Sequence, residues 1–163
     1  KYGRRARFWA GGTDLLIQWQ EDIVDFDHCI DLSFIPDLDC IKKSPDAVSI
    51  GSLTKIASIE DSSDFDNSLS IIREAAGELA TPQIRNTATA GGNLCHAAPS
   101  ADLATPLIVL GAKVMVTGIS GDRLVKMDDF FRHVNKTALK ENELLTEIEV
   151  PVPAAETRAP PWR

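Results

Sequence analysis

Two pairs of adjacent glycines are the residues whose type and spacing could bind an anion. Gly11-Gly12 precedes Thr13, and Gly91-Gly92 precedes Asn93. A diphosphate is held by several converging donors, and glycine has no Cβ to keep backbone N–H groups away from its oxygens. A helix that begins directly after such a loop adds the positive end of its dipole. We therefore expect a diphosphate site at the two loops; the alternative for each pair taken alone is a simple turn.

The usual sequence fingerprints of nucleotide-binding enzymes are absent. No two of the ten glycines stand two residues apart, which excludes G-x-G-x-x-G, and no G-x-x-x-x-G-K is present. A Rossmann dehydrogenase or a P-loop enzyme is therefore disfavoured. No Ser/His/Asp, Cys/His or paired-carboxylate arrangement stands out, so we predict no catalytic residue and expect any chemistry to come from a cofactor.

The composition is that of a globular protein with an acidic balance. The 163 residues include 17 Lys and Arg against 24 Asp and Glu, a net charge of −7, and 44% are hydrophobic. This charge disfavours nucleic acid and anionic lipid as partners. No apolar run approaches the roughly 20 residues that a membrane span requires, and none is expected.

Three cysteines limit the redox chemistry of this chain: Cys29, Cys40 and Cys95. They are too few for the four thiolates of an ordinary iron–sulfur cluster, and their number indicates a reducing, cytoplasmic compartment. Two of them lie beside histidines, in His28-Cys29 and Cys95-His96, but neither pair has the spacing of zinc ligands. No metal site is predicted.

The elements that position the two loops follow from the pattern of apolar residues. A strand over 5–10 is expected to end at the first glycine pair, and a helix over 15–20 to begin after it with Thr13 or Asp14 as its cap. The pattern further predicts strands at 29–32, 48–50 and 144–150, a hairpin over 113–127, helices over 54–60 and 68–79, and a buried helix or loop over 103–112.

Several segments together resemble the flavin-binding subunit of the molybdenum hydroxylases. This is the family of xanthine dehydrogenase, carbon monoxide dehydrogenase and the nicotine and aldehyde oxidoreductases. The resemblance covers nearly everything from Phe8 to Pro151, and its most specific part is the block Gln83–Leu94. Other matching segments are residues 10–15, Pro99, Asp102, 128–131, 136–137 and 143–148.

The resemblance implies an α+β fold, namely the two-lobed FAD-binding fold of the vanillyl-alcohol-oxidase (PCMH) type, with the family's C-terminal domain absent. Residues 1–50 would be a first lobe that lacks the family's initial strand and helix, 51–151 a second lobe, and 152–163 a linker or disordered tail. FAD would lie extended between the lobes. The residues that match the family's cofactor contacts are Trp9, Ala10, Gly11, Gly12, Thr13, Asp14, Leu15, Thr89, Ala90, Gly91, Gly92, Asn93 and Asp102.

The function implied by the resemblance is electron transfer. FAD on this chain would receive electrons from iron–sulfur clusters on a partner subunit, which in turn draw them from a molybdopterin-binding subunit. The electrons would leave to NAD⁺, a quinone or oxygen. Two alternatives remain: a stand-alone flavin oxidase or reductase of the same superfold, and a non-catalytic interaction module whose glycine pairs are only turns.

Some residues admit two interpretations. Asp102 could cap the apolar run that follows it, contact the cofactor, or do both. Arg85 could neutralise a phosphate or hold the loop through an ion pair. Core packing is expected for Trp9, with adenine stacking as the minority alternative. We do not expect a covalent flavin link through His96.

Overall fold

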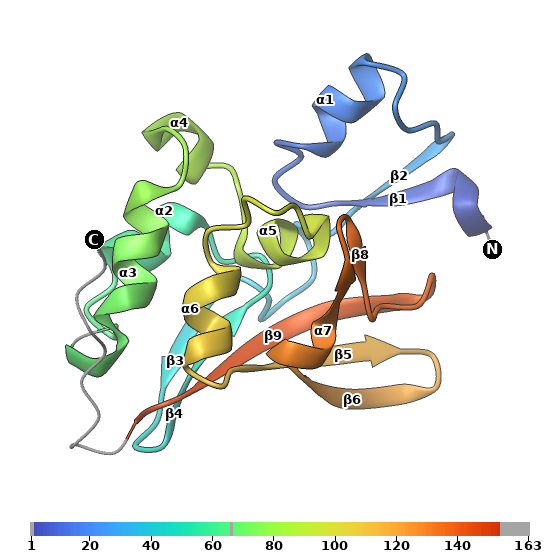
Figure 1. The fold of residues 1–163 in the computed structure, drawn as a ribbon. Helices are drawn as coiled ribbons and strands as arrows, with labels where there is room; N and C mark the ends of the chain where they lie inside the picture. Colours follow the sequence, from blue (N-terminus) through green and yellow to red (C-terminus); the bar gives the residue numbers. More distant parts are fainter. Residues whose placement is uncertain (1, 66, 154–163) are drawn as a thin grey trace.

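The largest element of the fold is a five-stranded antiparallel sheet. The computed structural model describes residues 2–65 and 67–153 (Figure 1). The strand order is β3-β4-β9-β5-β6, so the last strand in sequence lies at the centre. These strands are β3 (Ile41–Lys43), β4 (Ala47–Gly51), β5 (Lys113–Gly118), β6 (Gly121–Lys126) and β9 (Glu143–Pro151).

A bulge adjusts the central strand to its neighbour. The register between β5 and β9 passes from Met115↔Glu147 to Val116↔Leu145 and skips Thr146. Side chains alternate between the two faces of a strand, and one extra residue reverses that alternation. The extra residue allows Leu145 to be buried together with Ile148, although these residues stand three apart in the sequence.

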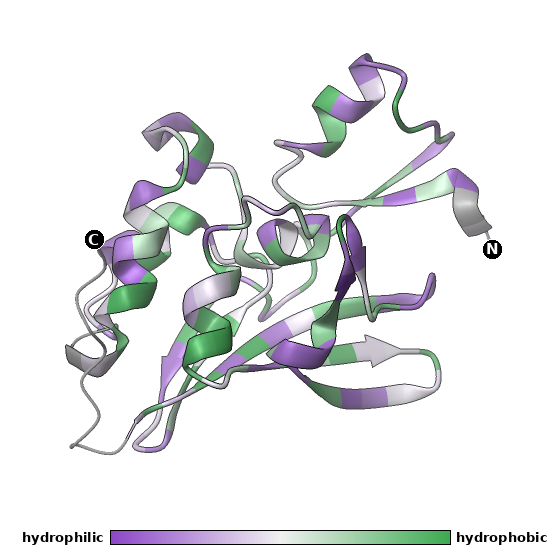
Figure 2. Cartoon of the chain, viewed as in Figure 1, coloured by the Kyte–Doolittle hydropathy of each residue, from purple (hydrophilic) through white to green (hydrophobic). Residues whose placement is uncertain are grey.

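Short helices cover one face of the large sheet (Figure 1). Both α3 and α6 carry hydrophobic and hydrophilic residues, as expected for helices with one buried side (Figure 2). In α3, Ile71, Ile72, Ala75 and Ala76 are buried in the apolar core that the helices share with the sheet, where Phe65 and Phe130 are also fully buried. The helical segments are α2 (Ile56–Asp61), η2 (Asn67–Leu69), α3 (Ser70–Glu78), α4 (Pro82–Arg85), α5 (Ala90–His96), α6 (Ala104–Val109) and α7 (Met127–Phe130).

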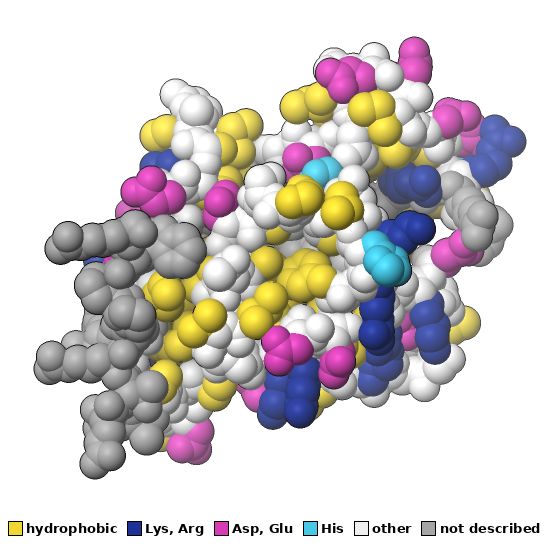
Figure 3. Space-filling model, in the orientation of Figure 1, with side chains coloured by type: hydrophobic (Ala, Val, Ile, Leu, Met, Phe, Trp, Pro, Cys, Tyr) yellow, Lys and Arg dark blue, Asp and Glu magenta, His cyan; other side chains and the backbone are white. Residues whose placement is uncertain are grey.

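A smaller part stands beside this layer and is built from the N-terminal residues. Its strands β1 (Ala6–Trp9) and β2 (His28–Asp31) are parallel neighbours, and η1 (Gly3–Arg5) and α1 (Leu15–Gln20) complete it. The surface over α1 carries hydrophobic and acidic side chains side by side (Figure 3), and Ile17 and Trp19 are about half exposed. A small apolar cluster of Leu32, Leu38 and Leu53 joins this part to the large sheet.

The predicted elements are present with shifted ends. Strands, helices and the hairpin occur where the apolar pattern indicates. Elements that were not predicted are β3, α4, α5, α7 and the two-stranded sheet of β7 (Phe131–His133) and β8 (Lys136–Thr137). Both β3 and β4 belong to the large sheet, so we propose that the boundary between the two parts lies between β2 and β3.

The predicted tail lies outside the described residues beyond position 153. None of the helices in the described ranges has the length and apolarity to cross a membrane.

Candidate cofactor site

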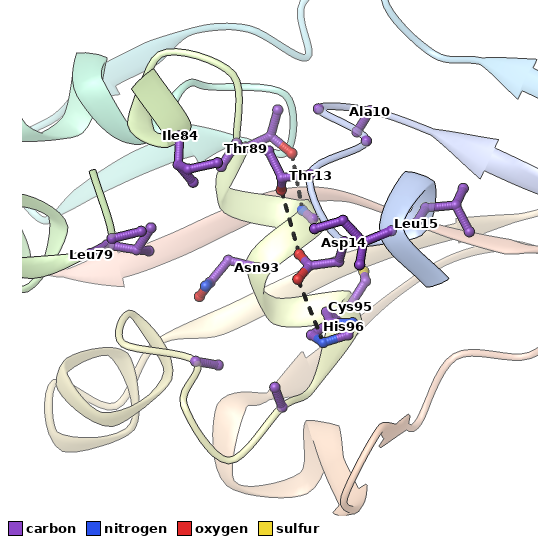
Figure 4. A pocket seen from close by; sticks show the side chains of 18 of the residues that line it. Ala10, Thr13, Asp14, Leu15, Leu79, Ile84, Thr89, Asn93, Cys95 and His96 are labelled. Carbon is purple, nitrogen blue, oxygen red and sulfur yellow. Dashed lines mark hydrogen bonds and ion pairs between the residues drawn. The ribbon is translucent and has the colours of Figure 1, made fainter. Parts of the chain in front are cut away.

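A cavity of about 630 Å³ separates the smaller part from the helices on the large sheet (Figure 4). The loop between β1 and α1 forms one wall, and the start of α5 forms the opposite wall. The ends of α3 and α4 and the segment after α5 complete it. The predicted residues that line it are Ala10, Gly11, Gly12, Thr13, Asp14, Leu15, Thr89, Gly92, Asn93 and Asp102. Both predicted loops therefore reach the same cavity.

The first glycine loop offers unpaired backbone donors to this cavity. At the N-terminal end of α1, the first backbone hydrogen bond is the one that the amide of Leu16 donates to the carbonyl of Gly12 at 3.0 Å. Among the described residues, no acceptor is bonded to the amides of residues 11–15. Consecutive backbone N–H groups without a protein partner, in a loop that lines a cavity, can donate hydrogen bonds to an oxyanion.

The glycines of this loop are required by packing within the protein. A Cβ on Gly11 would overlap the backbone carbonyl of Thr87, and a Cβ on Gly12 would overlap the ring of Trp9. Gly12 also has a φ of +71°, a conformation that other residues adopt at a cost. The absence of side chains thus lets the loop lie directly against its neighbours and keeps its amides at the cavity wall.

The second glycine pair lies inside α5, which corrects the expectation that a helix begins after it. Its residues occupy the first turn of that helix. Thr89 is the N-cap, and its hydroxyl accepts a hydrogen bond from the amide of Gly92 at 3.1 Å. The amide of Gly91 donates to the carbonyl of Ser52 at 2.8 Å. This pair therefore brings helix α5 close to the sheet, and its own amides are already used.

Asn93 adds an unpaired polar atom to this wall. Its side-chain Oδ1 is buried and has no hydrogen-bond partner among the described residues, and Figure 4 shows the side chain beside the cavity. A buried amide oxygen without a partner costs free energy unless a ligand or water donates to it. The free amides of the first loop and this acceptor together fit a ligand that carries both phosphate oxygens and hydroxyl groups.

Three of the predicted contact residues lie away from the cavity. Trp9 packs against the back of the first loop, where its ring faces Gly12. Ala90 and Gly91 are buried in the first turn of α5, on the side that packs against the protein. These residues support the walls of the site, and they do not line the main cavity.

The two predicted aspartate caps are wrong. Asp102 lines the cavity, but α6 begins at Ala104 after Leu103, and no side chain caps it. Asp14 occupies the N-cap position of α1, but its backbone is already helical and its side chain makes no capping bond. Its carboxylate instead lies 3.8 Å from Nε2 of His96 (Figure 4). Both aspartates thus line the cavity, and the Asp14 carboxylate faces His96 there.

Arg85 forms an ion pair with Glu60 and does not reach the cavity. Its Nε lies 2.7 Å from the Glu60 carboxylate, and its Nη1 donates to the carbonyl of Leu79 at 3.1 Å. The ion-pair interpretation is therefore confirmed. Two acidic side chains, Asp14 and Asp102, and one basic side chain, Arg7, line the cavity.

Several lining residues were not predicted from the sequence. His96 connects the two walls, because its Nδ1 lies 3.5 Å from Nε2 of Gln18 on α1 and its Nε2 faces Asp14. Leu79, Ile84 and Ala101 contribute apolar surface. An apolar residue at a cavity has the same sequence signature as one in a core, so no pattern could have singled these out. Within the described ranges, no group of side chains is arranged to hold a metal ion.

Comparison with known proteins shows the family of this chain. Residues 1–153 match the family described as the FAD binding domain in molybdopterin dehydrogenase. The xanthine dehydrogenase FAD-binding subunit of Escherichia coli O157:H7 is 35% identical over 148 residues, which are 90% of this chain and 51% of that protein. The carbon monoxide dehydrogenase medium chain of Hydrogenophaga pseudoflava is 35% identical over 149 residues, 91% of this chain and 52% of that protein.

Solved structures show the same fold. A carbon monoxide dehydrogenase structure from Hydrogenophaga pseudoflava superposes with a TM-score of 0.91 over 94% of this chain and 54% of that chain, at 35% identity. Quinoline 2-oxidoreductase from Pseudomonas putida 86 superposes with a TM-score of 0.88 over 93% and 53%, at 28% identity. The chain spans about half the length of these relatives, and the predicted α+β fold is confirmed. The chain therefore belongs to the family of FAD-binding domains of the molybdopterin dehydrogenases.

Proposed function

We propose that the protein is the FAD-binding electron-transfer subunit of a molybdenum-containing hydroxylase or dehydrogenase. The observation that carries this proposal is the meeting of two distant glycine segments at one cavity, where Gly12 and Gly92 both form its wall. Five free amides on one side and the unpaired Asn93 oxygen on the other match the diphosphate and hydroxyl groups of FAD.

The chain's own contribution is to bind and orient the cofactor. The amides of residues 11–15 would hold the diphosphate, Asn93 Oδ1 would accept a hydrogen bond from a hydroxyl group of the cofactor, and Trp9, Ala90 and Gly91 would support the two walls from behind. When bound, FAD supplies the redox chemistry, because it can accept and release electrons.

The electrons would come from iron–sulfur clusters on another subunit. The three cysteines of this chain are free, and three thiolates cannot ligate an ordinary cluster. The matched carbon monoxide dehydrogenase chain is called a medium chain, and the matched E. coli protein an FAD-binding subunit. We propose an iron–sulfur subunit and a molybdopterin-binding subunit as partners in the cytoplasm, and NAD⁺, a quinone or oxygen as acceptor.

The test uses the full-length protein purified without denaturation. We expect flavin absorption bands at one FAD per subunit, co-purification of two further subunits, and bleaching of the flavin bands when the complex receives its reducing substrate. A preparation that stays colourless after incubation with FAD would overturn the proposal. Turnover by the isolated subunit without partners would favour a stand-alone flavoenzyme instead.

A further inference from the structure

One side chain crosses the cavity and joins its two walls. His96 is the last residue of α5. Its Nε2 lies 3.8 Å from Oδ1 of Asp14 (Figure 4), and its Nδ1 lies 3.5 Å from Nε2 of Gln18. Asp14 and Gln18 stand four residues apart at the start of α1, so they lie on one side of that helix, one turn apart. A single imidazole therefore spans the first turn of α1.

Helix α1 depends on such contacts for its position. It is six residues long, all of them described, and none of them is buried. A helix this short is not stable by itself in water, so contacts with the rest of the protein must hold it. The beginning of the loop before α1 is placed by Gly11, which lies directly against the backbone of Thr87. At the end of the loop, His96 supplies the corresponding contact.

The other side of this contact is firmly held. Leu94, two residues before His96 in α5, is fully buried. Directly after His96, the carbonyl of Ala97 accepts a hydrogen bond from the amide of Asn135 at 2.9 Å. His96 therefore projects from a fixed support, and the element whose position it can control is α1.

The strength of the contact depends on the charge of the ring. The amide nitrogen of Gln18 can only donate, so Nδ1 of neutral His96 accepts and the ring proton is on Nε2, facing Asp14. The 3.8 Å between Nε2 and the Asp14 carboxylate is too long for a hydrogen bond but within the range of an ion pair. A second proton makes the ring a cation that attracts this carboxylate. The Gln18 amide can then turn and accept from Nδ1–H through its oxygen.

The other charged groups around His96 do not share this dependence on pH. Arg7 and Asp102 also line the cavity, and arginine and aspartate ordinarily keep their charge between pH 5 and 8, where histidine gains its charge. The Cys95 thiol is desolvated, which raises its pKa to about 12 and keeps it neutral in this range. The hairpin of β7 and β8, next to the end of α5, carries exposed basic side chains that do not line the cavity, namely Arg132, His133 and Lys136.

We propose that His96 is a positioning residue that acts as a pH-dependent latch: its protonated ring holds α1, and with it the first glycine loop, against the end of α5. Loss of the proton leaves the weaker contact with Gln18, and α1 moves away more often. The cavity of about 630 Å³ is present with this contact in place, so a ligand between the walls would select the latched arrangement. The consequence for FAD rests on the proposed function, whereas the latch itself does not.

The test measures the opening of α1 in the ligand-free, full-length protein. Hydrogen–deuterium exchange of the peptide that contains residues 15–20 is recorded at pH 6 and pH 8, and each rate is divided by the intrinsic exchange rate at that pH. An exposed ion pair changes an equilibrium by a factor of about two to five. We expect α1 to open less often at pH 6 than at pH 8 by about this factor. Asp14→Asn and His96→Gln should each abolish the difference.

The matched control is His133→Gln. This histidine is exposed on β7 and does not line the cavity, so its variant should keep the full difference between pH 6 and pH 8. Equal opening of α1 at the two pH values in the wild type would overturn the inference, and so would an unchanged difference in His96→Gln. Loss of the difference in His133→Gln would overturn it as well, because the sensitive group would then lie on β7.

Titration with FAD separates this latch from a direct contact between His96 and phosphate. The latch predicts an affinity that is about two- to fivefold higher at pH 6 than at pH 8 and that Asp14→Asn lowers at pH 6. A direct contact predicts a higher affinity in Asp14→Asn, because a carboxylate beside the bound anion is removed. That result would overturn the latch and leave the proposed function standing. A wild type that binds no FAD but shows the pH-dependent opening of α1 would overturn the proposed function and leave the latch standing.

Discussion

The ring of Trp9 fills the space into which any side chain at position 12 would project. A Cβ built on Gly12 overlaps ring atoms of Trp9, and Gly12 has a φ of +71°. The loop that carries the free amides is therefore held by two constraints, a left-handed backbone and an aromatic ring behind it. The fold of the loop therefore requires glycine at position 12 even without a bound phosphate.

Gly12→Ala should therefore destabilise the protein as well as weaken FAD binding. Gly111 is the matched control, because its φ is +68° but nothing lies within 4 Å of its would-be Cβ. Gly111→Ala should lower the free energy of unfolding by about 1–2 kcal/mol through backbone strain alone. Gly12→Ala should lower it by about 1–3 kcal/mol more through overpacking. Urea denaturation measures both, and equal losses would contradict the role of Trp9.

Arg85→Ala should reduce stability and leave FAD affinity unchanged. The guanidinium is mostly buried and bonds to Glu60 and to the carbonyl of Leu79. Loss of charge-assisted hydrogen bonds should lower the free energy of unfolding by about 2 kcal/mol. The exposed Arg132 provides the comparison, and its alanine variant should change stability by less than about 0.5 kcal/mol. A large loss of FAD affinity in Arg85→Ala, measured at a temperature where the variant is folded, would show that this side chain does contact phosphate.

FAD should protect Cys95 from alkylation. The residue borders the cavity and keeps exposed surface, but its thiol is desolvated, which raises its pKa to about 12. Since the thiolate is the reactive form, iodoacetamide should modify Cys95 slowly at pH 8, and more slowly still when FAD fills the cavity. Cys29 and Cys40, which do not border the cavity, serve as internal controls in peptide mapping by mass spectrometry. Equal labelling of Cys95 with and without FAD would place the cofactor elsewhere.

Acid should destabilise the wild type partly through Glu143. The Arg123 guanidinium and the Lys140 amide lower the pKa of this carboxyl from 4.5 to about 2. A carboxyl with a lowered pKa in the folded state contributes stability above its unfolded pKa, and that contribution is lost as the pH falls from about 5 towards 2. Glu143→Gln should therefore melt at a lower temperature than the wild type at pH 7, and the two melting temperatures should converge towards pH 2. A constant difference across this range would contradict the assignment.

The sequence predicted helices and hairpins whose apolar pattern lies within one short segment. The helix over 15–20 and the hairpin over 113–127 depend on neighbouring residues, and both are present. The position of β9 between β4 and β5 could not be predicted in the same way, because β9 pairs with β4, which lies about 100 positions earlier in the sequence. Helix α5 was not predicted, because its two glycines have low intrinsic helix propensity; the cap at Thr89 and contact with Ser52 stabilise them in the helix.

For the site, the sequence by itself determined which segments have backbone without side chains, because it places glycine at positions 11, 12, 91 and 92. It also supplied the resemblance that points to FAD. Only the tertiary structure decided that, among the described residues, the amides of the first loop have no partner while those of the second are bonded within the protein, and that the buried Ser52 Oγ has none either. The physical reason is that a hydrogen-bond partner is fixed by distance in space, and folding brings together groups that the sequence keeps far apart.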